Sequence, residues 1–244
     1  MLVSIITVSY NSETTIARTI QSVLDQTYPE IEYIIVDGQS KDATVETAEK
    51  FQAAFEASPG KTLTILSEPD RGMYDALNKG ARMAHGEIVG QINADDWYEP
   101  EAVETMVNHY KATDFDISWA DLRILKNSGN IIKKAHMGRL WTTAGFNHPT
   151  MFSKRSVLLE FPYACEHMDD DFDMVTRVKL AGKRMILTHG ILANYSFGGM
   201  STKKSFKNMC SRVQMKYATY RRYGFSPLYW FYCVAMEGAK FLLG

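Results

Sequence analysis

The amino-acid sequence predicts an α/β fold built on a doubly wound, mainly parallel sheet. In the first part of the chain, short apolar runs of strand length alternate with segments of helical periodicity. These apolar runs are continuous, which is typical of strands that are covered on both faces. Polar loops, most of them containing aspartate, follow the runs. Ligands of such sheets bind beyond the carboxyl ends of the strands, so these loops are the first candidates for a site.

The same periodicities define the elements that we expect in this first part. The expected strands are Leu2–Val8, Glu32–Val36, Thr62–Leu66 and Glu87–Ile92. The expected helices include Ile16–Leu24, Val45–Phe55, Gly72–His85 and Pro100–Tyr110. We expect Asn11 or Ser12 to cap the first helix and Ser40 or Asp42 to cap the second, because their side-chain oxygens accept helix-terminal N–H groups.

The pattern is more varied in the second part of the chain. Asp116–Leu125 and Asn130–His136 flank "KNSGN", which is typical of a β-hairpin. The other expected elements are a loop leading into a short strand (Asn147–Lys154), a helix (Met168–Leu180), two strands (Arg184–Thr188 and Leu192–Ser196) and helices after Ser205. The sequence contains neither repeats nor a clear linker, so we expect a single domain over residues 1–244.

Composition narrows the class of protein. Of the 244 residues, 45% are apolar and 23% are charged, which is typical of a globular chain, and the net charge of −1 argues against a nucleic-acid binder with a broad basic surface. The three cysteines, Cys165, Cys210 and Cys233, have no metal-site spacing and predict reduced thiols in a cytosolic protein. The N-terminus is typical of a buried strand rather than a signal peptide, and no apolar run is long enough to span a membrane.

The stretch "QINADDWYEP" places Asp95 and Asp96 side by side where the fourth strand should end. Adjacent carboxylates repel each other unless water, a cation or helix-terminal N–H groups offset the repulsion. The chain contains neither GxGxxG nor GxxxxGK[ST], so a bound nucleotide would lack a glycine-rich phosphate cradle. A divalent cation such as Mg²⁺ or Mn²⁺, held by carboxylates, is the alternative. A simple turn in which Asp96 caps the next helix also fits the pattern.

Two segments carry a resemblance to a known family. "VSIITVSYNSETTIARTIQSVLDQTYPEIEYIIVDGQSKDAT" and "EPDRGMYDALNKGARMAHGEIVGQINADD" resemble the family 2 glycosyltransferases of the GT-A fold. The resemblance is greatest to bacterial members that build exopolysaccharides, including those of the colanic-acid type. It is strong over residues 1–100 and looser to about residue 200. It implies a nucleotide-sugar-binding half (1–97), an acceptor-binding half (98–200) of smaller mixed structure, and C-terminal helices (201–244).

The resemblance also implies a role for each matching residue. In the family, the first strand lines the base and ribose, an acidic residue after the second strand hydrogen-bonds the base, and a basic residue lies near the phosphates. The matching nucleotide-sugar-binding residues here are Thr7, Val8, Tyr10, Asp37, Arg71 and Asp95. Asp96 matches the metal-binding position of the DxD-type motif, and the implied cofactor is Mn²⁺ or Mg²⁺.

Each of these residues also has an ordinary structural interpretation. Thr7 and Tyr10 suit a strand end, Asp37 suits an Asx-turn with Gly38, and Arg71 suits a solvated loop. Asp75 and Asn78 are spaced one helical turn apart, which suits either an exposed helix face or two side chains directed at one site. Only the occurrence of the motifs together, in the order of the family, favours the functional interpretation.

A catalytic base is expected in "EHMDDDFDMVTRV". Family members show an acidic residue, Asp, an aromatic residue and Asp, followed by Arg, and the second residue is the base. Alignment on Phe172, Asp173 and Arg177 makes Asp171 the base, while Asp170 becomes the base if the register shifts by one. Capping of the helix by acidic residues is the structural alternative, since a helix N-terminus favours negative charge.

Three further features are left open. His148 suits either a structural or an acceptor-binding role, and His189 precedes a GG-x-S segment (198–201) that resembles a family segment closing over the donor. The C-terminal tail combines aromatic and aliphatic residues from Leu228 to Leu243 with basic residues that begin at Lys203. Such a tail suits a peripheral membrane surface or packing against the domain or a second subunit.

The sequence thus predicts an inverting, metal-dependent glycosyltransferase. It would move a sugar from a nucleotide-sugar donor, UDP-linked, to a hydroxyl of a glycan or lipid-linked saccharide in bacterial surface polysaccharide synthesis. The expected location is the cytoplasm, with peripheral contact at the inner face of the cell membrane and a homodimer as alternatives. The competing functions are a catalytically silent nucleotide-sugar-binding protein and a sugar-nucleotide nucleotidyltransferase. A receiver-like module is disfavoured because its acidic pair should follow the first strand.

Overall fold

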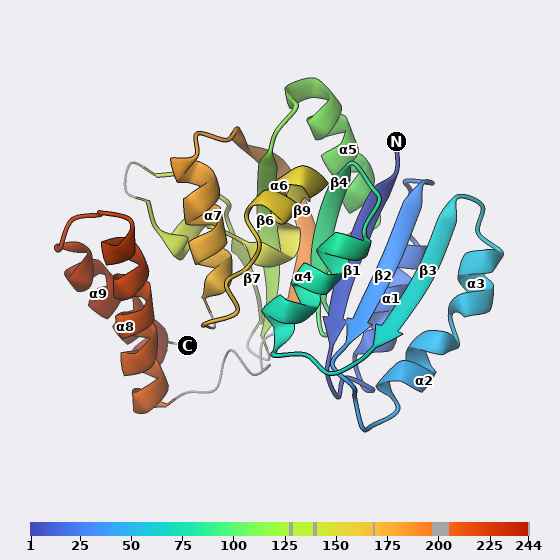
Figure 1. The fold of residues 1–244 in the computed structure, drawn as a ribbon, viewed down its shortest axis with the longest axis horizontal. Helices are drawn as coiled ribbons and strands as arrows, with labels where there is room; N and C mark the ends of the chain where they lie inside the picture. The colour runs from blue at the N-terminus through green and yellow to red at the C-terminus, as the bar shows by residue number, and fades with distance from the viewer. Residues whose placement is uncertain (127–128, 139–140, 168, 197–204, 244) are drawn as a thin grey trace.

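A single mixed sheet runs through the molecule (Figure 1). The computed structural model describes residues 1–126, 129–138, 141–167, 169–196 and 205–243. In sheet order the strands of these residues are β3 (Lys61–Ser67), β2 (Ile31–Asp37), β1 (Val3–Ser9), β4 (Ile88–Asn93), β8 (Phe152–Lys154), β6 (Ile117–Lys126), β9 (Met185–Ser196) and β5 (Trp97–Tyr98), and β7 (Gly129–Lys133) pairs with β6. The sequence prediction of an α/β fold with a mainly parallel first half is confirmed.

Strands β1 to β4 are parallel to one another and form one end of the sheet, with β3 at its edge. All seven residues of β1 are buried, because helices cover both faces. Val3 and Ile5 belong to the core on one face, while Ile6 and Val8 belong to the core on the other. The alternation of side chains along a strand therefore divides a continuous apolar run between two cores.

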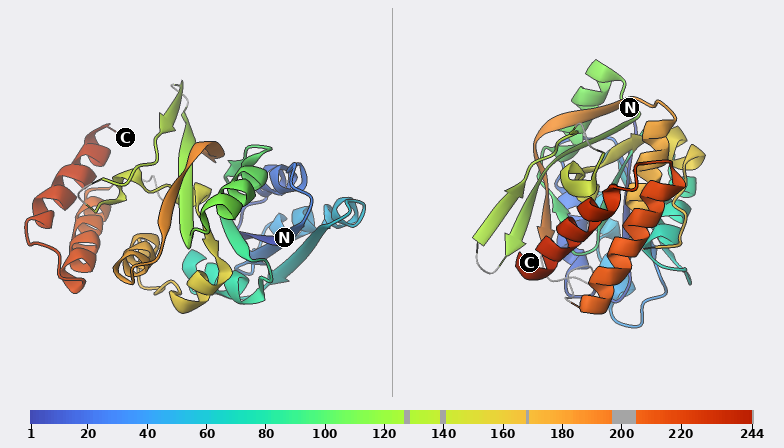
Figure 2. Two further views of the ribbon diagram at one scale, coloured as in Figure 1. Left: turned by 90° about the horizontal axis from the view of Figure 1, so that it is seen from above. Right: turned by 90° about the vertical axis from the view of Figure 1, so that its left-hand side faces the viewer.

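The helices divide between these two faces (Figure 1). Those on the first face are α1 (Ile16–Leu24), α2 (Thr44–Glu49), α3 (Gln52–Glu56) and α5 (Ala102–Thr113). Those on the second face are α4 (Met73–Met83), α6 (Arg155–Glu160) and α7 (Asp170–Leu180), with the short 3₁₀ segments Thr143–Gly145 and His148–Thr150 nearby. The last two helices, α8 (Phe206–Arg222) and α9 (Tyr229–Leu243), form a hairpin beyond α7 (Figure 2).

The predicted cap of the first helix is wrong. The N-cap position of α1 is Thr15, and no side chain caps this end. Asn11 instead adopts a positive φ of 49°, and its Oδ1 accepts the amide of Lys41. The backbone carbonyl of Ser12 accepts the amides of Thr15 and Ile16. The polar side chains between β1 and α1 therefore connect two loops at the edge of the sheet.

The second helix differs from its prediction in two ways. The predicted continuous helix over Val45–Phe55 is divided between α2 and α3. The N-cap position of α2 is Ala43, while Asp42 Oδ1 accepts the amide of Thr44 at 3.0 Å in a local turn. Ser40, the other predicted cap, bonds to Asp37. The apolar spacing still holds, because Ala48 and Phe55 are both buried in the same core.

The two predicted strands near the end of the sheet are one strand. β9 runs without a break from Met185 to Ser196 and pairs with β6 in parallel. The pairing shifts register near Asp121, opposite a segment in which Gly190 has a φ of 102°. The bulge contains His189 and Gly190, a polar pair that resembles a turn. Their presence in the sequence explains why two separate strands are predicted. The sequence pattern also gave no sign of β5 or α6, which are only two and six residues long.

The hairpin and the later helices follow the prediction. β6 and β7 pair antiparallel, and the tip at 127–128 lies outside the described residues. α8 packs against α7 through aromatic side chains, with the rings of Phe172 and Tyr220 at 5.2 Å. Within the described ranges, no helix combines the length and the apolar character needed to cross a bilayer.

Candidate active site

The residues singled out in the sequence converge on one edge of the sheet. β1, β2, β3 and β4 end there, and α7 begins at the same edge (Figure 1). The parallel arrangement explains this convergence, because it places the carboxyl ends of neighbouring strands together. The loops that carry Asp37, Arg71 and Asp96 therefore lie near the start of the helix that carries Asp171.

Asp37 is fully buried and ties the loops of this edge together. Its carboxylate accepts hydrogen bonds from the Ser9 hydroxyl at 3.0 Å, the Ser67 hydroxyl at 2.8 Å and both the amide and the hydroxyl of Ser40. A carboxylate has about four acceptor positions, and four donors already occupy them. The clearest effect of Asp37 is thus to join the ends of β1 and β3 to the loop after β2, and its contact with a nucleotide base stays a prediction.

The loop after Asp37 supports an exposed aromatic ring. Gly38 lies close to both side chains: a Cβ atom there would lie 2.7 Å from Asp70 Oδ2 and 3.4 Å from the ring of Tyr10, so a larger residue would require the Asp70 side chain to shift. Tyr10 is 59% exposed at the end of β1. Thr7 and Val8, three and two residues before Tyr10, are buried within β1. Thr7 Oγ1 accepts a hydrogen bond from the hydroxyl of Tyr33. Of these three predicted ligands, the structure presents only the side chain of Tyr10 to a ligand.

Arg71 lies at the entrance to α4 and is largely exposed. Its guanidinium contacts Asp75 Oδ1 at 3.2 Å, and its amide contacts Asp75 Oδ2. Burial acts to raise the pKa of Asp75, but these bonds outweigh it and the pKa is lowered. An exposed ion pair of this kind contributes little stability, so the guanidinium can turn toward an anionic ligand.

Asn78 does not share the surroundings of Asp75. Its amide bonds to both backbone groups of Tyr163, as donor to the carbonyl and as acceptor from the amide, each at 2.9 Å. The bonds fix the loop after α6 and bring the ring of Tyr163 to 5.0 Å from that of Tyr74. Asn78 therefore has a structural role here.

Asp95 and Asp96 occupy a desolvated loop after β4. Asp96 is fully buried; its Oδ1 accepts the amide of Ser196, and its Oδ2 has no hydrogen-bond partner among the described residues. Burial raises the pKa of Asp96 well above its ordinary value, and the charge of Asp95 raises it further. Burial likewise raises the pKa of Asp95. The N-cap position of α5 is Glu101, so the alternative that Asp96 caps this helix is wrong.

These observations fit a divalent cation at Asp96. A cation would satisfy the unpartnered oxygen and favour the ionised forms of both carboxylates. The described part of the chain contains no cluster of three or more His, Cys, Asp or Glu side chains suited to a metal. One or two protein carboxylates completed by phosphate oxygens is the coordination that Mg²⁺ commonly adopts.

Arg18 supports this loop and was not recognised in the sequence. Its guanidinium donates to the backbone carbonyl of Asp95 at 3.0 Å and to the Ser196 hydroxyl, and it stacks over the ring of Trp97 at 3.6 Å. A hollow of about 610 Å³ opens on this side of the loop. The spacing of Arg18 from the aspartates, more than seventy residues, gave no sequence signal for the contact.

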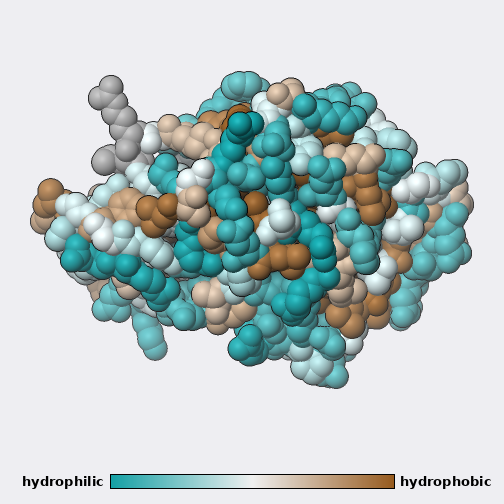
Figure 3. Space-filling view, turned by 45° about the horizontal axis from the view of Figure 1, so that its top comes forward, coloured by the Kyte–Doolittle hydropathy of each residue, from teal (hydrophilic) through white to brown (hydrophobic). Residues whose placement is uncertain are grey.

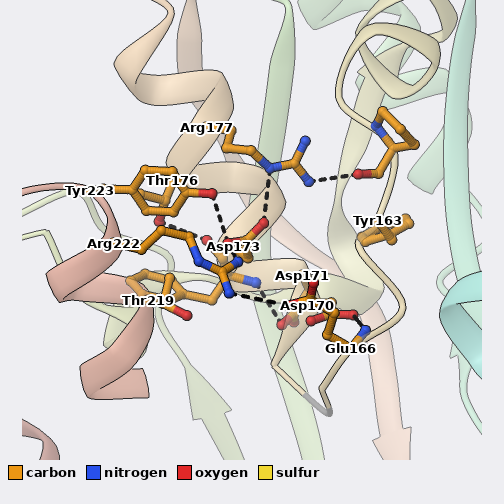
Figure 4. A network of polar contacts seen from close by, with 12 residues as sticks. Tyr163, Glu166, Asp170, Asp171, Asp173, Thr176, Arg177, Thr219, Arg222 and Tyr223 are labelled. Carbon is orange, nitrogen blue, oxygen red and sulfur yellow. Dashed lines mark hydrogen bonds and ion pairs between the residues drawn. The ribbon is translucent and has the colours of Figure 1, made fainter. Parts of the chain in front are cut away.

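The three consecutive aspartates at the start of α7 have different surroundings, and Figure 4 shows two of them, Asp170 and Asp171. Asp170 is buried and accepts the backbone amides of Glu166 at 2.7 Å and His167 at 3.1 Å, so it holds the preceding loop. Asp171 is half-buried and lines a cavity of about 250 Å³. Asp169 lines the same cavity.

The environment of Asp171 affects its protonation in two directions. Burial raises its pKa above that of an ordinary aspartate. The amide of Phe172, hydrogen bonding from the Tyr74 hydroxyl and the charges of Lys216 and Lys133 favour the ionised form. A carboxylate with a raised pKa that remains ionisable is suited to accept a proton. Tyr74 lies between Arg71 and Asp75 in the sequence, but no periodicity distinguished it.

Asp173 and Arg177 form the pair expected from their spacing, with Nε and Oδ2 at 2.9 Å. Asp173 also accepts a hydrogen bond from Tyr223 at 2.9 Å and lies 3.4 Å from Arg222 (Figure 4). Both partners belong to the end of α8, so this network attaches the C-terminal hairpin to α7.

The two histidines lie in different environments. His148 is half-buried, with Nε2 at 3.1 Å from Gln91 Oε1 and beside Tyr163, and burial lowers its pKa to about 4. His189 is exposed on β9, seven residues before Ser196, the residue that contacts Asp96. An extended strand rises about 3.3 Å per residue, so His189 is remote from the acidic pair. The GG-x-S segment (198–201) lies outside the described residues.

Comparison with known proteins identifies the family. The sequence model described as glycosyl transferase family 2 matches residues 4–168, more than half of the chain. The chain belongs to this family. It is 27% identical over 174 residues to the Escherichia coli UDP-Glc:α-D-GlcNAc-diphosphoundecaprenol β-1,3-glucosyltransferase WfgD, covering 69% of this chain and 66% of that protein. It is 34% identical over 105 residues to the Bacillus subtilis putative glycosyltransferase EpsH, covering 43% of this chain and 29% of that one. The chain thus spans less than two thirds of each relative.

Solved structures of other transferases share the fold. Staphylococcus aureus TarS 1–349 in complex with UDP-GlcNAc superposes with a TM-score of 0.71 at 16% identity, over 98% of this chain and 72% of that one. The Pyrobaculum calidifontis mannosyltransferase PcManGT, in complex with GDP-Man and Mn²⁺, superposes with a TM-score of 0.66 at 21% identity, over 99% of this chain and 70% of that one. The prediction of the GT-A fold is confirmed.

Proposed function

We propose that the protein is an inverting, metal-dependent glycosyltransferase that uses a UDP-linked sugar. The observation that carries this proposal is the position of Asp171: an ionisable carboxylate lines a cavity at the start of α7, while Asp96, in the loop after β4, has a buried oxygen without a partner among the described residues. The relatives named above support it, since WfgD and TarS are named with UDP-linked sugars, although PcManGT is named with a GDP-linked one. The acceptor would be a hydroxyl of a glycan or lipid-linked saccharide in bacterial surface polysaccharide synthesis.

The described residues can divide the reaction between them. Tyr10 and the loop fixed by Asp37 would hold the nucleoside, with Thr7 and Val8 forming the floor beneath it. Arg71 would contact the phosphates, Asp95 the ribose or sugar, and Asp96 the Mn²⁺ or Mg²⁺. The cation, when bound, neutralises charge on the departing diphosphate.

Asp171 would supply the base for inversion. Its carboxylate takes the proton of the acceptor hydroxyl while that oxygen bonds to the anomeric carbon and the bond from this carbon to the diphosphate breaks. A single displacement of this kind inverts the anomeric configuration and needs no covalent nucleophile on the protein. Asp170 is less suited to the role, because its two oxygens are already bound to the backbone of the preceding loop.

Calorimetry with UDP, GDP and their sugar conjugates, with and without Mn²⁺, tests this proposal. We expect a UDP-sugar to bind in the presence of Mn²⁺ and to bind much more weakly without it or in Asp96→Asn. Absence of binding by every nucleotide under all conditions would contradict a donor site. Binding without any transfer to saccharide acceptors would favour the silent binding protein.

The surface of the C-terminal hairpin suggests how a lipid-linked acceptor could be reached. One face of α9 exposes apolar side chains at helical spacing, and in Figure 3 the apolar residues at the left-hand end of the molecule lie among hydrophilic ones. The exposed apolar residues of the hairpin are Phe206, Leu228, Trp230, Phe231, Val234 and Leu242. The exposed basic residues Lys207 and Arg221 lie on α8. We infer a peripheral contact with an anionic membrane surface.

Flotation with vesicles tests this contact. We expect the full chain to float with vesicles containing anionic lipid, and a variant with both Phe231→Ser and Leu242→Ser to remain unbound. Leu159→Ser, an exposed position on α6, serves as the control. Wild-type protein that fails to float but elutes as a dimer, which the double variant converts to a monomer, would assign the surface to a second subunit.

A further inference from the structure

The cavity beside Asp171 is lined by side chains from the second half of the chain. It lies between β7, the start of α7, and helices α8 and α9, and its volume is about 250 Å³. Its charged lining residues are Lys133, Asp169, Asp171, Lys216 and Lys240. The lining therefore holds three lysines against two carboxylates, and one of these carboxylates, Asp171, is the proposed base.

Two of these lysines have carboxylate partners. Lys216 is 3% exposed and pairs with Glu237, which is itself almost fully buried, and it lies 4.0 Å from Asp169. Lys240 contacts the same Glu237 oxygen at 3.1 Å. One carboxylate thus serves both lysines, and this triad also connects α8 to α9.

Lys133 has no such partner. Its Nζ donates to the backbone carbonyl of Phe146 at 2.7 Å, and none of the ion pairs formed by the described residues includes it. Burial, followed by the charge of Lys240, lowers its pKa, Asp171 opposes the shift, and the resulting pKa is about 8. A partly buried ammonium without a counter-charge is costly, and a bound anion would reduce that cost.

Asp169 completes the set of unsatisfied groups. Its Oδ2 is buried without a hydrogen-bond partner among the described residues. A ligand that offers hydroxyl donors near Asp169 and an anionic group near Lys133 would satisfy both. A neutral saccharide would satisfy only the carboxylate.

We propose that the acceptor carries an anionic group, the phosphate or carboxylate of a sugar derivative, and that Lys133 and Lys240 bind this group while the acceptor hydroxyl faces Asp171. The inference rests on the proposed transferase function and specifies the class of acceptor. Lysine binds phosphate and carboxylate as a compact charge, which suits either source of the anion. Of these two ammonium groups, that of Lys133 also favours the ionised form of Asp171.

Binding of simple probes to the full chain tests the proposal. The protein is first saturated with UDP and Mg²⁺, so that the donor site is filled, and is then titrated with N-acetylglucosamine 1-phosphate, glucuronic acid and neutral N-acetylglucosamine. We expect at least one charged probe to bind about tenfold or more tightly than the neutral sugar, as a charge-assisted contact would give. Preference for the phosphate or for the uronic acid identifies the source of the anion.

Matched variants assign the preference to this cavity. Lys133→Met should remove most of the preference for the charged probe over the neutral sugar. Lys133→Arg should keep this preference, which would exclude a folding defect as the cause. Lys134→Met is the control, because Lys134, the residue after β7, is 73% exposed and pairs with Asp121 of β6. Equal binding of charged and neutral probes, no binding of either charged probe, or a preference that persists in Lys133→Met would each overturn the proposal. Failure of UDP to bind in the first step would instead count against the proposed function.

The pH dependence gives a second reading. Lys133 is cationic below its pKa, so binding of glucuronic acid should weaken as the pH rises through about 8. The charged groups around Lys133 come from three helices. They are Asp169 and Asp171 at the start of α7, Lys216 of α8 in its ion pair with Glu237 of α9, and Lys240 of α9. Lys133→Arg should remove this dependence, because arginine stays charged throughout the range. A wild-type profile that is flat from pH 7 to 9 would contradict the assignment.

Discussion

The donor edge of the sheet and the cavity beside Asp171 are built in opposite ways. At the donor edge, Asp37 is saturated by four hydrogen bonds from three serines, and the loops are fixed before any ligand arrives. In the cavity, Lys133 has no carboxylate partner and Asp169 has an unpartnered oxygen. Under the proposed function, the first would be a preorganised site for the donor and the second a site whose charges the acceptor completes.

The largest expected effect separates catalysis from donor binding. Asp171→Asn removes the base, so transfer should fall by about 10²- to 10⁴-fold, the range typical of general-base catalysis. Donor affinity, measured by calorimetry with Mn²⁺, should be nearly unchanged, because the donor edge is formed by other elements. Equal loss of transfer and donor binding would place the base elsewhere and remove the distinction between the two regions.

Asp37→Ala should instead affect the stability of the donor edge. It leaves the hydroxyls of Ser9, Ser40 and Ser67 without their common acceptor, so we expect the free energy of unfolding to fall by about 2–4 kcal/mol. Urea unfolding measures this change. Ser67→Ala, which removes one donor only, is the graded control and should cost about 1 kcal/mol. A negligible loss in Asp37→Ala would show that the edge is not preorganised in the way the bonds suggest.

Tyr74→Phe tests whether the two regions are coupled through α4. Hydrogen bonding from Tyr74 favours the ionised form of Asp171, so its loss should raise the pKa of the base and move the rise of transfer rate to higher pH. We expect kcat to fall by about tenfold on the rising limb of the pH profile, where the base titrates, with little change in KM for the donor. Tyr28→Phe, whose hydroxyl bonds to the carbonyl of Met1 far from the site, is the control. An unshifted pH profile would rule out this positioning role.

The smallest expected effect is on stability at the cavity. Burial raises the pKa of Asp171 in the folded state, so the folded state binds the proton more tightly and loses stability as the pH rises through the interval between the unfolded and folded values. Above that interval Asp171→Asn should be more stable than the wild type, by about 1 kcal/mol or less, and below it the difference should vanish. Thermal unfolding across pH measures this, and a destabilised variant at neutral pH would show that Asp171 is already well paired.

Much of the fold could be predicted from periodicity alone, and the misses have local causes. Three of the four parallel strands, β1, β2 and β4, are almost completely buried runs, a pattern typical of a parallel sheet covered on both faces. β9 was split in the prediction because a bulge containing Gly190 resembles a turn. β5 was missed because its two residues are too short to show a period.

The sequence by itself determined the family, the parallel sheet and the position of the acidic loops at one edge, because these depend on local pattern and on motifs in a fixed order. Only the tertiary structure distinguished Asp170, bound to loop amides, from Asp171, which lines the cavity. Likewise, Lys133 and Lys240 are remote in the sequence and meet only because α8 and α9 fold back beside β7. Burial and pairing of charges depend on contacts between distant segments, and no local pattern records them.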